Sequence, residues 1–237
     1  MAKESIFKDA IIRIMRDNNG HASVKLLSRK LPEYIDMSRI KGKTPLATMR
    51  RELQRGHFIR IGFGVWALND ARLPSAPTPK TQKEEKERKH ADIQGMLLEI
   101  GNNRDECADT YTPDRKGIFD QMYLGSIATI DEIPHFTYDH IIKTVRYADV
   151  IWFSERKFPH SVFEVEHSTN FVNALTKFCD LQDFNARFCC VAESSREDKF
   201  EREVNRPAFK AIKDRCEFIT YESVEHDYNI ALQKTRI

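Results

Sequence analysis

Apolar residues recur at helical spacing at the start of the chain. The first stripe consists of Phe7, Ala10, Ile11, Ile14 and Met15. The Asn-Asn-Gly segment at 18–20 ends that helix, and a second short helix is predicted over 24–31 with Ser23 as its N-cap. A third helix begins at Thr44-Pro45, because threonine is a good N-cap and proline suits the first helical position. Strands over 57–61 and 65–68 follow, so the pattern predicts three small helices and a hairpin, the order of a winged helix-turn-helix.

The third predicted helix has two different faces. Its apolar face consists of Leu46, Met49 and Leu53, and the opposite face of Ala47, Thr48, Arg51 and Arg55. An exposed face of threonine and arginine suits the major groove of DNA, where arginine pairs with guanine. Lys25, on the second helix, is expected to contact phosphates without regard to sequence. We therefore predict DNA binding, and contact with a protein is the alternative use of this module.

A second set of patterns predicts alternating helices and strands after residue 88. A helix over 89–100 buries Ile93, Met96, Leu97 and Ile100, with Glu99 among them. Strands rich in apolar residues are predicted over 148–153, 161–167, 188–192 and 217–221, and helices over 170–183 and 196–214, the last interrupted at 205–207. In the 188–192 strand, Cys189 and Cys190 are expected to act as small apolar residues. The order predicts a mixed α/β core with a sheet flanked by helices.

Composition and charge change between these two parts. Residues 70–89 carry prolines at 74, 77 and 79 and no apolar period, which is typical of a linker that runs into a charged helix near Gln82. The net charge is +8 over 1–69, +2 over 70–89 and −8 over 90–237, although the whole chain of 237 residues carries only +2. A compact segment of +8 suits phosphate backbones, whereas the acidic part would repel DNA unless bound metal neutralised its carboxylates. We predict a domain over 1–70, a linker over 71–88 and a second domain over 89–237.

Three carboxylates fall in the predicted strands of the second domain. Asp149 begins one strand, and Glu164 and Glu166 lie on the same face of the next. Like charges inside an apolar strand raise each other's pKa or demand a cation, and carboxylate oxygens are the ligands that Mg²⁺ prefers. The pattern predicts a metal site, with an exposed edge face for the glutamates as the alternative. Lys177, on the following helix, supplies a positive charge there if it points inward, and otherwise lies on a solvated face.

The remaining composition excludes several classes of protein. Five cysteines, an odd number with no C-x-x-C pair, argue against a disulfide framework and a cysteine-based zinc site, and suit a cytoplasmic protein. The histidines form no H-E-x-x-H array, so we do not expect a zinc hydrolase. Apolar runs are too short for a membrane span, and the first residues lack the apolar core of a secretory signal.

Two motifs in the first 69 residues carry a family resemblance. The segments GKTP at 42–45 and HFIRIGFGVWAL at 57–68 resemble the HARE-type winged helix, a module shared by chromatin proteins and restriction endonucleases. The resemblance implies DNA binding, and some members of that family are suspected of sensing modified bases. The residues expected to contact DNA are Lys43, Thr48, Arg51, Arg55, Arg60 and Phe63.

The strand ADVIWF, the segment FEVEHST and the order of elements over 89–221 resemble the PD-(D/E)xK nuclease superfamily, which has the restriction-endonuclease-like fold. The resemblance implies that Asp149 takes the place of the aspartate and Glu164 that of the second acidic residue. Glu166 stands where lysine is usual, and Ala148 stands where the motif has proline. In restriction endonucleases with an ExE site, a glutamate from the helix before the sheet joins the cluster, which points to Glu99 in this chain.

Together these features predict an α+β or α/β protein, an N-terminal winged helix joined to a restriction-endonuclease-like domain. The predicted function is that of a restriction-type DNA endonuclease dependent on Mg²⁺, with Mn²⁺ as a substitute. Asp149, Glu164, the carbonyl of Val165 and Glu99 are expected to hold the metal, and Glu166 to orient or deprotonate the attacking water. The expected partner is double-stranded DNA, with no membrane, and cutting of both strands favours a homodimer. The alternatives are a DNA-binding regulator with an inactive nuclease fold and a repair nuclease that reads DNA structure.

Overall fold

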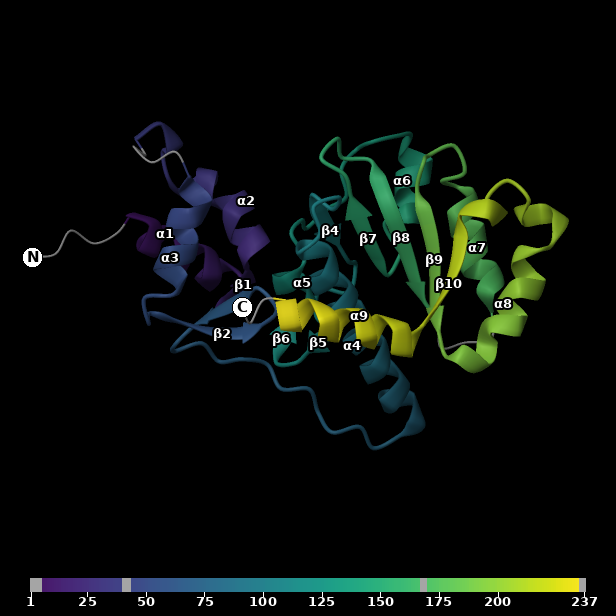
Figure 1. Ribbon diagram of the computed structural model, residues 1–237, viewed down its shortest axis with the longest axis horizontal. Helices are drawn as coiled ribbons and strands as arrows, with labels where there is room; N and C mark the ends of the chain where they lie inside the picture. The colour runs from purple at the N-terminus through teal and green to yellow at the C-terminus, as the bar shows by residue number, and fades with distance from the viewer. Residues whose placement is uncertain (1–5, 40–43, 167–169, 235–237) are drawn as a thin grey trace, which may run out of the picture.

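The N-terminal part of the chain places three helices against a small antiparallel sheet (Figure 1). The computed structural model describes residues 6–39, 44–166 and 170–234. The elements of this part are α1 (Ile6–Asp17), β1 (His21–Ser23), α2 (Val24–Tyr34), the 3-10 turn η1 (Met37–Arg39), α3 (Pro45–Leu53), β2 (Phe58–Gly62) and β3 (Val65–Leu68). The predicted helices and hairpin are present, and β1, too short to show a period, completes a sheet of order β1-β3-β2.

The apolar stripes of these helices meet in a core of their own. Ile11, Leu27, Met49 and Leu53 are among its buried members. Leu46 was predicted for the same buried face but is 40% exposed, because the core does not extend to the first turn of α3.

The second part is built on a five-stranded mixed sheet of order β10-β9-β8-β7-β4. Its strands are β4 (Asp109–Tyr111), β7 (Val150–Phe153), β8 (Pro159–Val165), β9 (Arg187–Ala192) and β10 (Cys216–Thr220). The pairs β10–β9 and β9–β8 are parallel, whereas β8–β7 and β7–β4 are antiparallel. A separate two-stranded hairpin, β5 (Ile118–Phe119) with β6 (Met122–Tyr123), lies outside this sheet.

Helices cover both faces of the five-stranded sheet. One face packs against α4 (Gln82–Asn102), α5 (Leu124–Ile127) and α9 (Tyr221–Lys234), and the other against α6 (Asp139–Val145), α7 (Phe171–Cys179) and α8 (Glu197–Val204). Short 3-10 turns, η2 (Ser194–Arg196), η3 (Pro207–Phe209) and η4 (Lys213–Arg215), flank α8. The mixed sheet with helices on both faces is the predicted class, consistent with a restriction-endonuclease-like fold. Within the described ranges, no helix combines the length and apolarity needed to cross a membrane.

Successive residues of the central strands serve opposite cores, as the period of two predicted. On β8, Phe163 belongs to the core under α4 and Val162 to the core under α7. Cys189 and Cys190 divide in the same way on β9, and both are buried free thiols. These small side chains therefore pack as apolar residues on both faces of the sheet.

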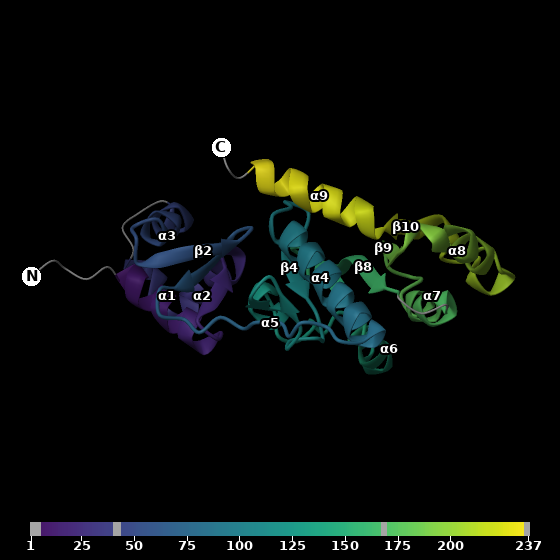
Figure 2. The same cartoon turned by 90° about the horizontal axis from the view of Figure 1, so that it is seen from below.

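The two parts of the chain are joined by more than the segment between them. Phe63 and Val65, from the β2–β3 hairpin, belong to the same apolar core as residues of α4 and α9. The amide of Tyr123 donates to His21 Nε2 at 3.1 Å, and Ser126 Oγ donates to the carbonyl of Asn18 at 3.1 Å. In Figures 1 and 2, the chain after β3 runs along the outside of this junction until it enters α4.

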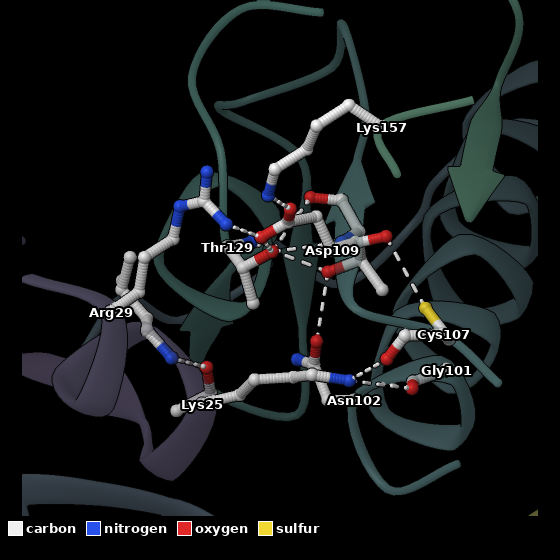
Figure 3. A network of polar contacts seen from close by, with 11 residues as sticks. Lys25, Arg29, Gly101, Asn102, Cys107, Asp109, Thr129 and Lys157 are labelled. Atoms are coloured by element: carbon white, nitrogen blue, oxygen red, sulfur yellow. Dashed lines mark hydrogen bonds and ion pairs between the residues drawn. The ribbon is translucent and has the colours of Figure 1, made fainter. Parts of the chain in front are cut away.

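Polar contacts around a buried carboxylate also join the two parts of the chain (Figure 3). Asp109, on β4, is fully buried and forms ion pairs with Arg29 of α2 and with Lys157 of the β7–β8 turn. Thr129 Oγ1 donates a further hydrogen bond to Asp109 Oδ1 at 3.2 Å. A buried charge needs such compensation, so the contacts fix α2 against β4 and the β7–β8 turn.

Candidate active site

The candidate site forms where β7 begins and β8 ends. In the antiparallel register, Val150 pairs with Phe163, so the next position on each strand brings Asp149 beside Glu164. The amide of Val165 donates to Asp149 Oδ2 at 2.7 Å, which ties the carboxylate of one strand to the backbone of the other. The sheet therefore brings together the two acids that the sequence predicted.

Two side chains of α4 complete the surroundings of Asp149. His90 Nε2 lies 3.3 Å from Asp149 Oδ2, and Gln94 Nε2 donates to Asp149 Oδ1 at 3.3 Å. Burial has the largest single effect on the pKa of His90 and lowers it. The hydrogen bond to Asp149 and the negative charges of Asp149, Asp114 and Glu166 together outweigh burial, so the pKa of His90 lies above its usual value.

His90 and Gln94 were not predicted from the sequence. They lie four residues apart on one face of a helix, and this spacing is the signal that could have revealed them. Gln94 is fully buried, and its Oε1 has no hydrogen-bond partner among the described residues, although its Nε2 is bonded to Asp149. The position of Gln94 among the apolar residues of α4 is a second feature of the sequence that could have indicated a functional site beside this helix.

Glu164 is buried and has a cationic partner from the helix α7. Lys177 Nζ donates to Glu164 Oε1 at 2.9 Å and to Oε2 at 2.7 Å, and also to the carbonyl of Tyr147 at 3.1 Å. Burial, reinforced by the charge of Asp149, raises the pKa of Glu164 to about 8, and Lys177 offsets these effects only in part. Lys177 thus points inward, which was one of the two alternatives for this residue.

Glu166 follows β8 at the same edge of the sheet. Its amide donates to the carbonyl of Val191 at 2.8 Å, and its carbonyl accepts a hydrogen bond from the hydroxyl of Tyr221 at 2.9 Å. Its negative charge helps to raise the pKa of both His90 and Glu164, so its carboxylate belongs to the same electrostatic cluster.

Glu99 lies elsewhere, and its predicted place in the cluster finds no support in its contacts. Tyr228 of α9 donates to Glu99 Oε2 at 2.5 Å, and a methyl group built on Gly62 would meet Glu99 Oε1 at 2.5 Å. Burial raises the pKa of Glu99 to about 8. Glu99 follows Gln94 by five residues, which at 3.6 residues per turn is about 140° around the helix, and its carboxyl faces Tyr228 of α9 and Gly62.

The residues predicted to contact DNA fall into three groups. Arg51, Arg55 and Arg60 are exposed and Thr48 is partly exposed, so all four are accessible. Lys43 lies outside the described residues. The prediction for Phe63 is wrong, because its side chain is only 3% exposed and packs edge-on against Tyr228, with ring centroids 6.5 Å apart.

Lys25 also has a different role from the one predicted. Its ammonium donates to the carbonyl of Cys107 across the junction between the two parts (Figure 3). A lysine held by a main-chain oxygen of the second part is not placed for a phosphate contact.

The donor set at Asp149 and Glu164 fits a hard divalent cation. In the described parts of the chain, no group of three or more His, Cys, Asp or Glu side chains has the arrangement of a metal site. Two neighbouring carboxylates and the adjacent backbone of Val165 are nevertheless what Mg²⁺ uses, since it keeps several of its waters and takes one or two carboxylates. A structural zinc ion, which needs four protein ligands, does not fit.

Comparison with known proteins places this site within a restriction-enzyme segment. Residues 72–236 match the family model described as the type II restriction enzyme NmeDI C-terminal domain. The Type II restriction enzyme NmeDI of Neisseria meningitidis serogroup C is 30% identical over 103 residues, which are 41% of this chain and 29% of that protein. The chain therefore spans less than a third of the length of this relative, and no solved structure matches it. The match to the family model covers well over half of the chain, and the chain belongs to the family of the NmeDI C-terminal domain.

Proposed function

We propose that this protein is a restriction-type DNA endonuclease that depends on a divalent metal ion. The observation that carries the proposal is the juxtaposition of Asp149, directly before β7, and Glu164, near the end of β8, with the ammonium of Lys177 on Glu164. Two acids can hold a metal ion and a lysine can stabilise negative charge, and these are contributions that metal-dependent phosphodiester hydrolysis uses. The family match, which covers residues 72–236, supports the same activity.

Asp149 and Glu164, with the carbonyl of Val165, would hold Mg²⁺, and Mn²⁺ is expected to replace it. When bound, such an ion lowers the pKa of water and neutralises charge on the phosphate in the transition state. The amide of Val165 and the side chains of His90 and Gln94 fix the orientation of the Asp149 carboxylate. We leave Glu99 out of this set because its carboxyl is engaged with Tyr228.

Lys177 would supply the positive charge that the usual motif places two residues after the second acid. In this chain that position is Glu166, and the lysine comes from α7 instead. Its ammonium is held by Glu164 and by the carbonyl of Tyr147, so it lies next to the acid pair and can stabilise charge on the scissile phosphate. Glu166 remains the proposed group for orienting or deprotonating the attacking water.

The N-terminal part is proposed to be a winged helix of the HARE type that binds double-stranded DNA. The exposed residues Arg51, Arg55 and Arg60 and the partly exposed Thr48 support this role, and Lys43 is included from the sequence. Arginines on α3 would read base edges in the major groove. Sensitivity to base modification, and a homodimer that cuts both strands, belong to the same proposal.

Sequencing the ends of digested DNA tests this function. Genomic DNA with and without modified bases is incubated with the full-length protein and Mg²⁺ or Mn²⁺, and the new ends are mapped. A restriction endonuclease gives ends at one recurrent sequence, and a difference between the two DNA samples shows sensitivity to modification. Ends confined to flaps and junctions would indicate a repair nuclease, and binding without cleavage a regulator with an inactive site.

A further inference from the structure

The segment between the two parts of the chain forms one wall of a groove that leads to the candidate active site. The groove has a volume of about 790 Å³. Its walls are the segment 76–80, the first three turns of α4 and the loop before β5. His90 belongs to its lining and also lies 3.3 Å from the carboxylate of Asp149. The groove and the candidate active site are therefore adjacent.

The groove carries more positive than negative side chains. Its cations are Lys80, Lys83, Lys86, Arg88 and Lys116, and its acids are Glu84, Glu87 and Asp114. This excess of cations contrasts with the net charge of −8 over residues 90–237. The groove is thus a local basic strip beside an acidic domain.

The acids of the groove are occupied by local structure. Glu84 accepts a hydrogen bond from the amide of Lys80 at 2.6 Å, as part of the start of α4. Asp114 accepts one from the amide of Gly117 at 2.9 Å, and Glu87 lies 3.7 Å from Lys83. Their charges are therefore partly compensated within the protein.

Three of the cations have no such compensation. Lys80, Lys86 and Lys116 are exposed, and none of them forms an ion pair with a described residue. Cations gathered in one groove repel each other, and a bound polyanion relieves this repulsion. DNA fits this description, because a duplex carries one negative charge per about 1.7 Å of its axis.

We infer that this groove binds the sugar–phosphate backbone of the DNA that flanks the scissile phosphate, through Lys80, Lys86 and Lys116. The inference rests on the proposed endonuclease function, since a phosphate held at Asp149 and Glu164 brings the neighbouring phosphates to a groove that begins at His90. The segment predicted to be a linker is then part of the substrate-binding surface. Its prolines keep it extended along the wall of the groove.

The salt dependence of DNA binding tests this inference in the full-length protein. Fluorescence anisotropy measures the affinity for a 30-base-pair duplex between about 50 and 300 mM salt, with Ca²⁺ in place of Mg²⁺. The triple substitution Lys80→Ala, Lys86→Ala and Lys116→Ala is compared with a control of equal charge change. The control replaces three other lysines by alanine: Lys199 on α8, Lys210 directly after η3, and Lys213 at the start of η4.

Each phosphate contact contributes roughly 0.9 to the slope of log affinity against log salt. The groove variant is therefore expected to lower that slope by about 2 to 3 and to slow cleavage, whereas the control leaves both near the parent values. A slope equal to the parent's, in a parent that binds and cleaves DNA, overturns the groove and leaves the endonuclease standing. A parent that neither binds nor cleaves duplex DNA overturns both.

Discussion

Replacing Glu99 by glutamine is expected to make the protein more stable at alkaline pH. Burial raises the pKa of Glu99 from 4.5 to about 8, so the native state keeps a proton that the unfolded chain has already released. Because the native state binds more protons in this range, the free energy of unfolding falls as pH rises from about 5 to about 8. Above pH 8 the carboxylate is ionised in an apolar place, and its destabilising effect is complete.

The magnitude follows from the size of the shift. One pKa unit corresponds to about 1.4 kcal/mol, so the full effect is on the order of 5 kcal/mol as an upper bound. Glutamine keeps a hydrogen bond with Tyr228, but it still buries a polar amide, which costs part of the gain. We therefore expect a net gain of about 1 to 3 kcal/mol at pH 9 and little or no gain at pH 5.

Urea unfolding at pH 5, 7 and 9 measures this difference. The matched control is Glu85→Gln, an exposed carboxylate on the same helix, which should follow the parent at every pH. Glu164 also has a raised pKa, but it is unchanged in both proteins, so the difference between them isolates Glu99. The opposite result is a free energy of unfolding that is lower for Glu99→Gln than for the parent by the same amount at all three pH values. It would refute this assignment, because it would mean that the native protein needs the carboxyl for its structure.

Three further outcomes are expected. Asp109→Asn should lower the free energy of unfolding in urea by about 3 to 5 kcal/mol, because it leaves Arg29 and Lys157 without their buried partner. Arg29→Ala should lower it less, because Lys157 still pairs with Asp109. Equal and small losses in the two variants would contradict the role of these ion pairs in the junction. Alanine at Arg51 or Arg55 should cost about 1 to 3 kcal/mol of specific binding and relax the sequence preference at one position, whereas uniform losses over all sequences would reduce α3 to a backbone contact. Mg²⁺ or Ca²⁺ at a hundredfold excess over its Kd should stabilise the protein by about 2.7 kcal/mol, measured as a rise in Tm, and Glu164→Ala should remove most of this rise.

Much of the fold was predictable because most of its elements have a regular apolar period. The strand that follows Asp149, the strand carrying Glu164 and the helix carrying Lys177 were found in this way, and the face of Glu164 followed from the alternation on β8. The short elements β1, β4, β5 and β6 have two or three residues each, which is too few to display a period. The last helix, α9, was also missed, although Tyr221, Val224 and Tyr228 pack one of its faces against the shared core.

The site was only partly predictable, because sequence patterns do not fix how one element meets another. The direction of Lys177 depends on how α7 packs in the fold. The phase of α4 places His90 and Gln94 beside Asp149, and Glu99 beside Tyr228. Phe63 is buried because the N-terminal part packs against α4 and α9. The sequence predicted two domains joined by a linker and gave no sign of this contact between them. The same docking engages Lys25 at a main-chain oxygen of the second part.

The most direct test of the proposed active site is cleavage of plasmid DNA by matched variants. Glu164→Gln keeps the shape of the side chain but cannot ionise to bind Mg²⁺ as a carboxylate. Lys177→Ala removes the cation, and Lys210→Ala changes an exposed lysine that has no contact with Asp149 or Glu164 among the described residues. With Mg²⁺, the parent and Lys210→Ala should cleave, and the other two variants should lose about 100-fold or more while showing cooperative unfolding like the parent. Full cleavage by Glu164→Gln, with the same dependence on Mg²⁺ as the parent, would contradict the assignment of the active site to this edge of the sheet.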